Sequence, residues 1–125
     1  MANDSAKDIL RFEEVVAETN PVAVIWQEYT EINSSEKLDF QKSYDDLDYL
    51  IYAILSLESG NKVALVRHEH APNPGTEICV SHNQIEIASV ILEALNGLSL
   101  SIEDLTWVHS DYKHELQDLI NSVVR

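Results

Sequence analysis

Hydrophobic side chains follow the spacing of a helical face near the start of the chain, and the pattern changes soon after. In residues 6–18 they recur every three to four positions, which is typical of an amphipathic helix. The positions are Ile9, Leu10, Phe12, Val15 and Val16. Asn20-Pro21 then interrupts the pattern. We therefore expect a helix over residues 6–18, preceded by a frayed segment, residues 1–5.

Residues 22–32 allow two interpretations. β-Branched and aromatic side chains are dense here, and these residue types favour a strand. Some of them also share one helical face, which Asn20-Pro21 could open: Val22, Ile25, Trp26 and Tyr29. We prefer the strand because of the density of strand-forming residues, and the helix stays as the alternative. A polar loop is expected over residues 33–41.

Helical periodicity is clear in residues 43–58. The apolar positions form one stripe: Leu47, Leu50, Ile51, Ile54 and Leu55. Ser43 and Asp46 are spaced like a capping box, with Asp in the place of the usual Glu or Gln. Ser59-Gly60 follows as a stop signal. The pattern predicts a helix over residues 43–58.

Residues 62–81 have the pattern of a β-hairpin. Apolar residues at the centre of 62–70 predict one strand, and residues 76–81 predict the returning strand. Proline, asparagine and glycine in residues 71–75 are typical of a turn. A helix should follow, with Asn83 as its cap and Glu86 three residues later. Its apolar face would be Ile87, Val90, Ile91, Ala94 and Leu95.

The end of the chain again allows two interpretations. Trp107 and Val108 suit a short strand over residues 105–109, which a helix over residues 112–124 would follow. Alternatively, one helix could cover residues 101–124, because apolar side chains there also keep a helical spacing. These positions are Ile102, Leu105, Val108, Tyr112 and Leu116.

With the strand options, the order of elements predicts a single α+β domain over residues 1–125. Residues 22–109 would form a ferredoxin-like β-α-β-β-α-β core with an antiparallel sheet, and the N-terminal and C-terminal helices would be additions to it. In this arrangement the third and fourth strands flank the first. His82 and His109 would then reach the rim of the sheet near Asn20-Pro21, while His68 and His70 would lie at the opposite rim.

Charge narrows the range of partners. The 125 residues include 22 Asp and Glu but only 8 Lys and Arg, so the formal net charge is −14. Such a field repels nucleic-acid phosphates and anionic lipid, and it favours a basic protein or a cation as partner.

The single cysteine, Cys79, excludes an internal disulfide. No apolar run is long enough for a membrane helix, so we expect a soluble, cytoplasmic protein.

The histidine-rich segment around residue 69 is a candidate metal site. On a strand, His68 and His70 point to the same face, two residues apart, and could bind one divalent cation. A carboxylate across the hairpin, Glu77, could complete the ligands. Solvated hairpin side chains are the simpler interpretation. No other cofactor is expected.

Candidate catalytic groups follow the last predicted strand. His109 and Asp111 could place an imidazole beside a carboxylate, and His82 is expected at the same rim, so either histidine could act as a general base. Ser110 could be a nucleophile, but no nucleophile elbow surrounds it. The simpler interpretation is that Ser110 caps the last helix and Asp111 interacts with its dipole.

The two tryptophans fall on strands that are neighbours in the predicted sheet. Trp26 and Trp107 could therefore form a cross-strand cluster. We expect at least one of them to pack in the core. On an open face of the sheet, the same pair could instead bind a partner protein.

Three hypotheses of function follow. The chain has only 3 glycines and no phosphate-binding loop or nucleotide fingerprint. We therefore expect a non-enzymatic regulatory or protein-interaction domain that presents an acidic surface to a partner and could form a homodimer. A divalent-cation-binding protein that uses His68 and His70, or surface carboxylates, is the second hypothesis. A small hydrolase that uses His109 or His82 is the third.

Overall fold

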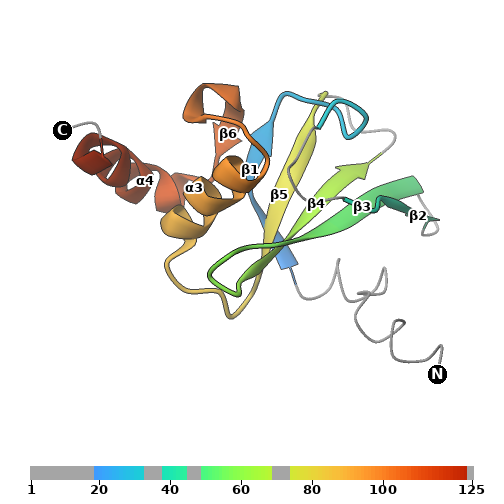
Figure 1. Ribbon diagram of the computed structural model, residues 1–125, viewed down its shortest axis with the longest axis horizontal. Helices are drawn as coiled ribbons and strands as arrows, with labels where there is room; N and C mark the ends of the chain where they lie inside the picture. The colour runs from blue at the N-terminus through green and yellow to red at the C-terminus, as the bar shows by residue number, and fades with distance from the viewer. Residues whose placement is uncertain (1–18, 33–37, 45–48, 69–73, 124–125) are drawn as a thin grey trace.

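The computed structural model describes residues 19–32, 38–44, 49–68 and 74–123, which form one antiparallel sheet and two α-helices (Figure 1). In chain order the elements are β1 (Thr19–Ile25), β2 (Gln41–Tyr44), β3 (Tyr49–Ser56), β4 (Lys62–His68), β5 (Thr76–Ser81), α3 (Ile87–Gly97), a single 3-10 turn η1 (Ile102–Asp104), β6 (Leu105–Val108) and α4 (Ser110–Val123). None of the described helices is long and apolar enough to cross a bilayer. The helix predicted for residues 6–18 lies outside the described residues.

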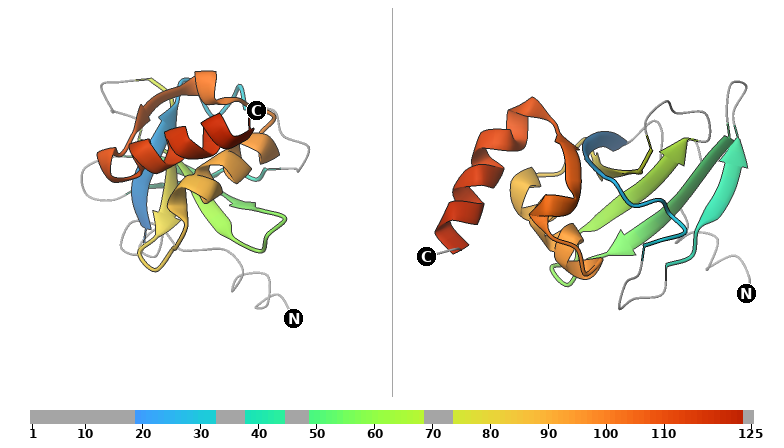
Figure 2. Two further views of the ribbon diagram at one scale, coloured as in Figure 1. Left: turned by 90° about the vertical axis from the view of Figure 1, so that its left-hand side faces the viewer. Right: turned by 90° about the horizontal axis from the view of Figure 1, so that it is seen from above.

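The six strands lie in the order β2-β3-β4-β5-β1-β6, and every neighbouring pair is antiparallel. β1 therefore lies between β5 and β6, although both of these strands come much later in the chain. Figure 2 shows α3 and α4 at the end of the molecule that carries β1 and β6, whereas β2 and β3 form the other end. The outermost strands described are β2 and β6.

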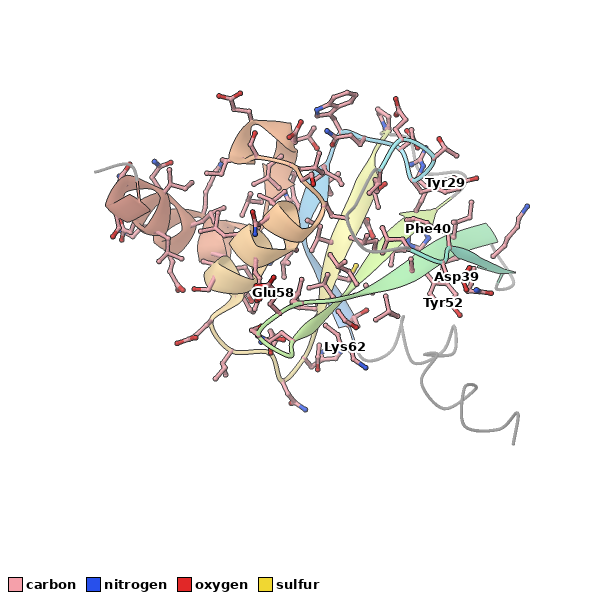
Figure 3. The ribbon with its side chains drawn as sticks, in the orientation of Figure 1. Tyr29, Asp39, Phe40, Tyr52, Glu58 and Lys62 are labelled. Atoms are coloured by element: carbon pink, nitrogen blue, oxygen red, sulfur yellow. The ribbon has the colours of Figure 1, made fainter. Side chains whose placement is uncertain are left out.

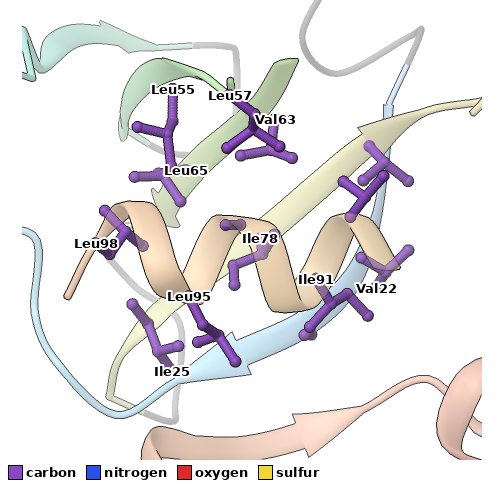
Figure 4. Packing of buried hydrophobic residues seen from close by; sticks show 14 of the residues in the cluster. Val22, Ile25, Leu55, Leu57, Val63, Leu65, Ile78, Ile91, Leu95 and Leu98 are labelled. Carbon is purple, nitrogen blue, oxygen red and sulfur yellow. The ribbon is translucent and has the colours of Figure 1, made fainter. Parts of the chain in front are cut away.

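The main hydrophobic core lies between α3 and the sheet (Figure 4). It joins side chains of β1, β4, β5 and α3, none of which is more than 2% exposed: Val22, Ile25, Leu65, Ile78, Ile91 and Leu95. Complete burial of one such side chain stabilises the fold by about 1.5–3 kcal/mol relative to exposure. This core therefore determines which face of the sheet α3 covers.

A second, smaller cluster lies on the other face of β3, β4 and β5. Its members are Leu50, Tyr52, Ala64, Val66 and Cys79. Residues of β4 alternate between the two clusters, because successive side chains of a strand point to opposite faces. Burial on both faces explains why the centre of β4, residues 63–66, is a continuous apolar run.

The helix predicted for residues 43–58 is wrong. β2 and β3 occupy this stretch instead and pair with each other, for example Lys42 with Ile51. β3 also pairs along its length with β4, from Leu50 opposite His68 to Ser56 opposite Lys62. Residues 49–55 are apolar at every position, so they fit a strand buried on both faces as well as a helical stripe. Pairing with β4 decides between the two.

The ferredoxin-like order is therefore also wrong, because the first crossover is not a helix. The connection between β1 and β2 includes the described side chains Ile32, Leu38 and Phe40, which pack against the main core. The rings of Tyr29 and Phe40 lie 5.4 Å apart along it (Figure 3). One part of the predicted order is nevertheless found: the third and fourth predicted strands, which are β5 and β6, flank the first, β1. The β2-β3 hairpin extends the sheet beyond β4.

Both regions for which the sequence allowed a strand or a helix contain a strand. Residues 22–32 contribute to β1, which ends at Ile25, earlier than expected. The C-terminal region forms β6 followed by α4, so the single helix over residues 101–124 is wrong. The hairpin predicted for residues 62–81 is confirmed by the pairing of β4 with β5.

Helix α3 begins later than the sequence predicted. Its first residue is Ile87, and the residue before it, Glu86, has a left-handed backbone with φ of 53°. Asn83 therefore does not cap the helix. The predicted apolar face is confirmed. Four of its five residues are buried, namely Val90, Ile91, Ala94 and Leu95, and the fifth, Ile87, packs against the core.

Candidate functional site

A groove of about 600 Å³ lies where β5, β1 and β6 run side by side, on the face of the sheet opposite α3. We call it the tryptophan groove. Its lining residues come from the three strands and the residues next to them: Pro21, Val24, Trp26, Pro74, Glu77, Thr106 and Trp107. Strand alternation assigns it to this face, because the neighbouring residues Ile25, Ile78 and Val108 contact the main core.

The register of the strands places the groove residues in one row. Val24 of β1 is opposite Glu77 of β5 and also opposite Trp107 of β6. Trp26 is two residues after Val24 and so continues on the same face. A register irregularity between Val24 and Ile25 leaves Thr106 beside Trp107, and both of these residues line the groove.

Asp104 holds Trp26 in place. The indole Nε1–H of Trp26 donates to Asp104 Oδ1 at 2.9 Å, and the backbone N–H of Trp26 donates to the Asp104 carbonyl at 3.1 Å. Gln27 Nε2 donates to the same carboxylate oxygen at 2.8 Å. Two contacts from one residue therefore fix both the backbone and the indole of Trp26.

The Asp104 carboxylate is stabilised as an anion. The backbone N–H of Ser101 donates to its Oδ2 at 2.9 Å. This bond, followed by the bond from Gln27, lowers the pKa of Asp104 below its ordinary value of 3.8. Sequence reasoning missed this residue. Ser101 and Asp104 do have capping-box spacing, but nothing local indicates the contact with Trp26, 78 positions away.

Trp107 is supported from the side of α4. Its ring meets the His109 ring edge-on, with centroids 5.9 Å apart and planes at 73°, and the rings of His109 and Tyr112 lie 5.3 Å apart. Edge-to-face contacts of this kind contribute about 0.5–1.5 kcal/mol. The series of three rings connects the tryptophan groove with the first turn of α4.

Both tryptophans are half-exposed, which corrects the expectation that at least one packs in the core. Trp26 is 51% exposed and Trp107 is 45% exposed. The physical reason is strand alternation, since their neighbours Ile25 and Val108 point to the main core. The structure therefore places the pair on the open face, which was the alternative.

The groove has a negative charge and no positive one of its own. Glu77 is the only ionisable residue among its seven lining residues. The Glu77 side chain is 35% exposed, and its Oε1 lies 3.9 Å from Nε2 of His68. A cationic group that entered the groove would meet this carboxylate together with the faces of indole rings, which also attract cations.

His82 and His109 both lie at the rim of the sheet where β1 begins, as the sequence predicted. His82 Nδ1 is 3.0 Å from Nδ2 of Asn20, and the backbone N–H of His109 donates to the carbonyl of Val22 at 2.9 Å. His68 lies at the opposite rim, because it is the last residue of β4 and pairs with Leu50 near the start of β3.

His109 has a structural role at the start of α4. Its Nδ1 accepts the backbone N–H of Asp111 at 3.1 Å, so His109 caps the helix in the place of the expected Ser110. The Asp111 carboxylate is 3.8 Å from the same nitrogen and largely exposed. Nothing here tests the catalytic hypothesis for His109, Asp111 and His82, which stays a prediction.

The metal hypothesis is also untested. His68 and Glu77 supply one imidazole and one carboxylate, but within the ranges that the structure describes no three His, Cys, Asp or Glu residues form a group that could hold a metal ion. His70 lies outside the described residues. Cys79 is buried, and burial raises the pKa of its thiol, so it packs as a small hydrophobic residue rather than serving as a thiolate ligand.

Comparison with protein-family models, with curated proteins and with solved structures finds no match to this chain.

Proposed function

We propose that this chain is a non-enzymatic protein-interaction domain that binds a protein partner through the tryptophan groove. The observation that carries the proposal is the presence of two half-exposed tryptophans, Trp26 and Trp107, on one open face of the sheet. Tryptophan is enriched among the residues that dominate binding energy at protein interfaces. Large apolar side chains that share an exposed hollow are also typical of an interaction site.

The fixed position of the indoles supports the same proposal. Asp104 holds the indole of Trp26, and His109 supports Trp107. Immobilising a side chain on binding costs about 0.5–1.5 kcal/mol, so side chains that are already held lose less entropy when a partner arrives.

The charge supports a basic partner. The chain has a formal net charge of −14, and the groove contains Glu77 but no lysine, arginine or histidine. Complementary charges accelerate encounter and suppress wrong partners, and salt weakens both effects. We therefore expect the complex to be weaker at high salt.

A comparison of captured proteins tests the proposal. The full chain and its variants Trp26→Ser, Trp107→Ser and Ile85→Ser are immobilised and exposed to a lysate of the source organism at low and high salt. Ile85 is the matched control, because it is a large apolar residue, 75% exposed, and not part of the groove. We expect a protein that the wild type and Ile85→Ser retain at low salt, and that both tryptophan variants lose. Equal capture by all four chains would contradict the proposal.

A further inference from the structure

The outer side of β6 is open. β6 is the last strand in the sheet order, and no strand of the described residues pairs with its outer side. A second hollow, of about 420 Å³, borders it; we call it the β6–α4 pocket. All four residues of β6 line this pocket together with the start of α4: Leu105, Thr106, Trp107, Val108, His109, Ser110 and Lys113.

The backbone of β6 directs polar groups to this open side. The carbonyl of Asp104 accepts from Trp26, and the N–H of His109 donates to Val22, so both groups point toward β1. Along a strand, successive peptide groups alternate between the two edges. In a trans peptide the N–H also points away from the C=O, so the N–H of Leu105 and the carbonyl of Val108 point to the open edge. An edge with such groups can pair with another strand.

The two hollows meet along this edge. Thr106 and Trp107 line both the tryptophan groove and the β6–α4 pocket. A strand that paired with β6 would direct its side chains alternately to the two faces of the sheet. One set would therefore lie on the side of the tryptophan groove, next to Trp107, from where a long side chain could reach into the groove, and the other set would lie beside the β6–α4 pocket.

The charges of the two hollows are opposite. The tryptophan groove contains Glu77 and no basic residue, whereas the β6–α4 pocket contains the positive charge of Lys113 and no acidic residue. Positive side chains therefore suit the first hollow, where an arginine or lysine could also stack on an indole. Acidic or apolar side chains suit the second.

We infer that the bound part of the partner is an extended segment that adds to β6 as a further strand, with arginine or lysine at alternate positions in the tryptophan groove. This mode of recognition takes affinity from main-chain hydrogen bonds and specificity from pockets for alternate side chains. The inference rests on the proposed function, since it requires that the tryptophan groove is a binding site.

Selection from a library of random linear peptides, each about eight residues long, tests the inference with the full chain immobilised. We expect the selected peptides to carry Arg or Lys at every second position. The best peptide is then made in two N-methylated forms. Methylating the amides that face β6 should weaken binding about tenfold, because edge hydrogen bonds are lost, whereas methylating the intervening amides should change it less than about threefold. Equal effects of the two forms would overturn strand addition.

Variants of the chain separate this inference from the proposed function. Glu77→Gln should weaken the arginine-containing peptide about fivefold, whereas Glu103→Gln, which removes an exposed acid outside the groove, should leave binding unchanged. If the selected peptides lack alternating basic residues but bind Trp107→Ser more weakly than the wild type, the inference is overturned and the proposed function stands. Peptides that bind Trp107→Ser as well as the wild type would contradict both.

Self-association has to be distinguished from binding of another protein. Sedimentation equilibrium of the wild type and of Trp107→Ser makes this distinction. We expect both to be monomers, because a second copy would bring the same negative charge to Glu77. A wild-type dimer that dissociates in Trp107→Ser would show that the occupant of the edge is a second copy, and would overturn the inference.

Discussion

The two faces of the sheet at β1 and β6 differ in what covers them. On one face, Ile25 and its neighbours contact α3 and are completely buried. On the other face, the next residue in the chain, Trp26, is 51% exposed. No helix of the described residues lies over this second face, and a groove occupies it. Residues that are adjacent in the chain therefore differ in their surroundings: the covered face stabilises the fold, and the other face stays open.

Large-to-small substitution on the covered face should have the largest effect. Ile78→Ala removes methyl groups from a residue that is fully buried in the main core. We expect the free energy of unfolding to fall by about 2–5 kcal/mol, since a cavity adds to the lost transfer free energy. Urea unfolding followed by circular dichroism measures this. A loss below about 1 kcal/mol would mean that the two faces do not differ in the way proposed.

Substitution on the open face should affect binding rather than stability. Trp107→Ser is expected to lower the affinity for a partner or selected peptide by at least about 30-fold, equivalent to about 2 kcal/mol, because interface tryptophans contribute disproportionately. The free energy of unfolding should change by less than about 1 kcal/mol, because the side chain is half-exposed. Loss of folding in this variant would instead make Trp107 part of the core.

The cap of α4 should have a smaller effect on stability. His109→Ala removes the acceptor of the Asp111 N–H, and we expect a loss of about 0.5–2 kcal/mol. His109→Asn supplies another capping side chain and should recover most of this loss. Thermal unfolding of the three chains checks the expectation. If both variants are equally destabilised, the ring contacts with Trp107 and Tyr112 matter more than the cap.

The smallest expected effect is on how the stability of the fold depends on pH, to which Asp104 contributes. The pKa of Asp104 is lowered in the folded chain, so its contribution to stability is present above the ordinary value of 3.8 and is lost as the pH falls through the folded-state pKa. Asp104→Asn should therefore melt at a lower temperature than the wild type at pH 7. This difference should shrink below about pH 4.

Local patterns predicted part of the fold. Residues 62–81 were expected to form a hairpin and pair as β4 and β5, because turn residues separate two short apolar runs. The apolar face of α3 was also predicted, because its helical spacing has no competing interpretation. Residues 49–56 were predicted as part of a helix, because the continuous apolar run of residues 49–55 satisfies both periods. Pairing with β4 resolved that ambiguity.

The candidate site was predicted only in part. Trp26 and Trp107 were recognised as neighbours on adjacent strands, and the pairing of β1 with β6 brings them into one groove. Asp104 was missed, because its contact with Trp26 joins residues 78 positions apart. The placement of both tryptophans on the open face could not be read from their residue type, which suits a core as well as an interface.

The sequence alone determined the acidic net charge, the hairpin of β4 and β5 and the apolar face of α3, since each depends on residues that are close together in the chain. Only the tertiary structure decided that residues 49–56 are a strand, that β6 is an outer strand, and that Trp26 and Trp107 share an open groove. The reason is physical: the direction in which a strand residue points follows from alternation, but which of the two faces is covered depends on elements far away in the chain.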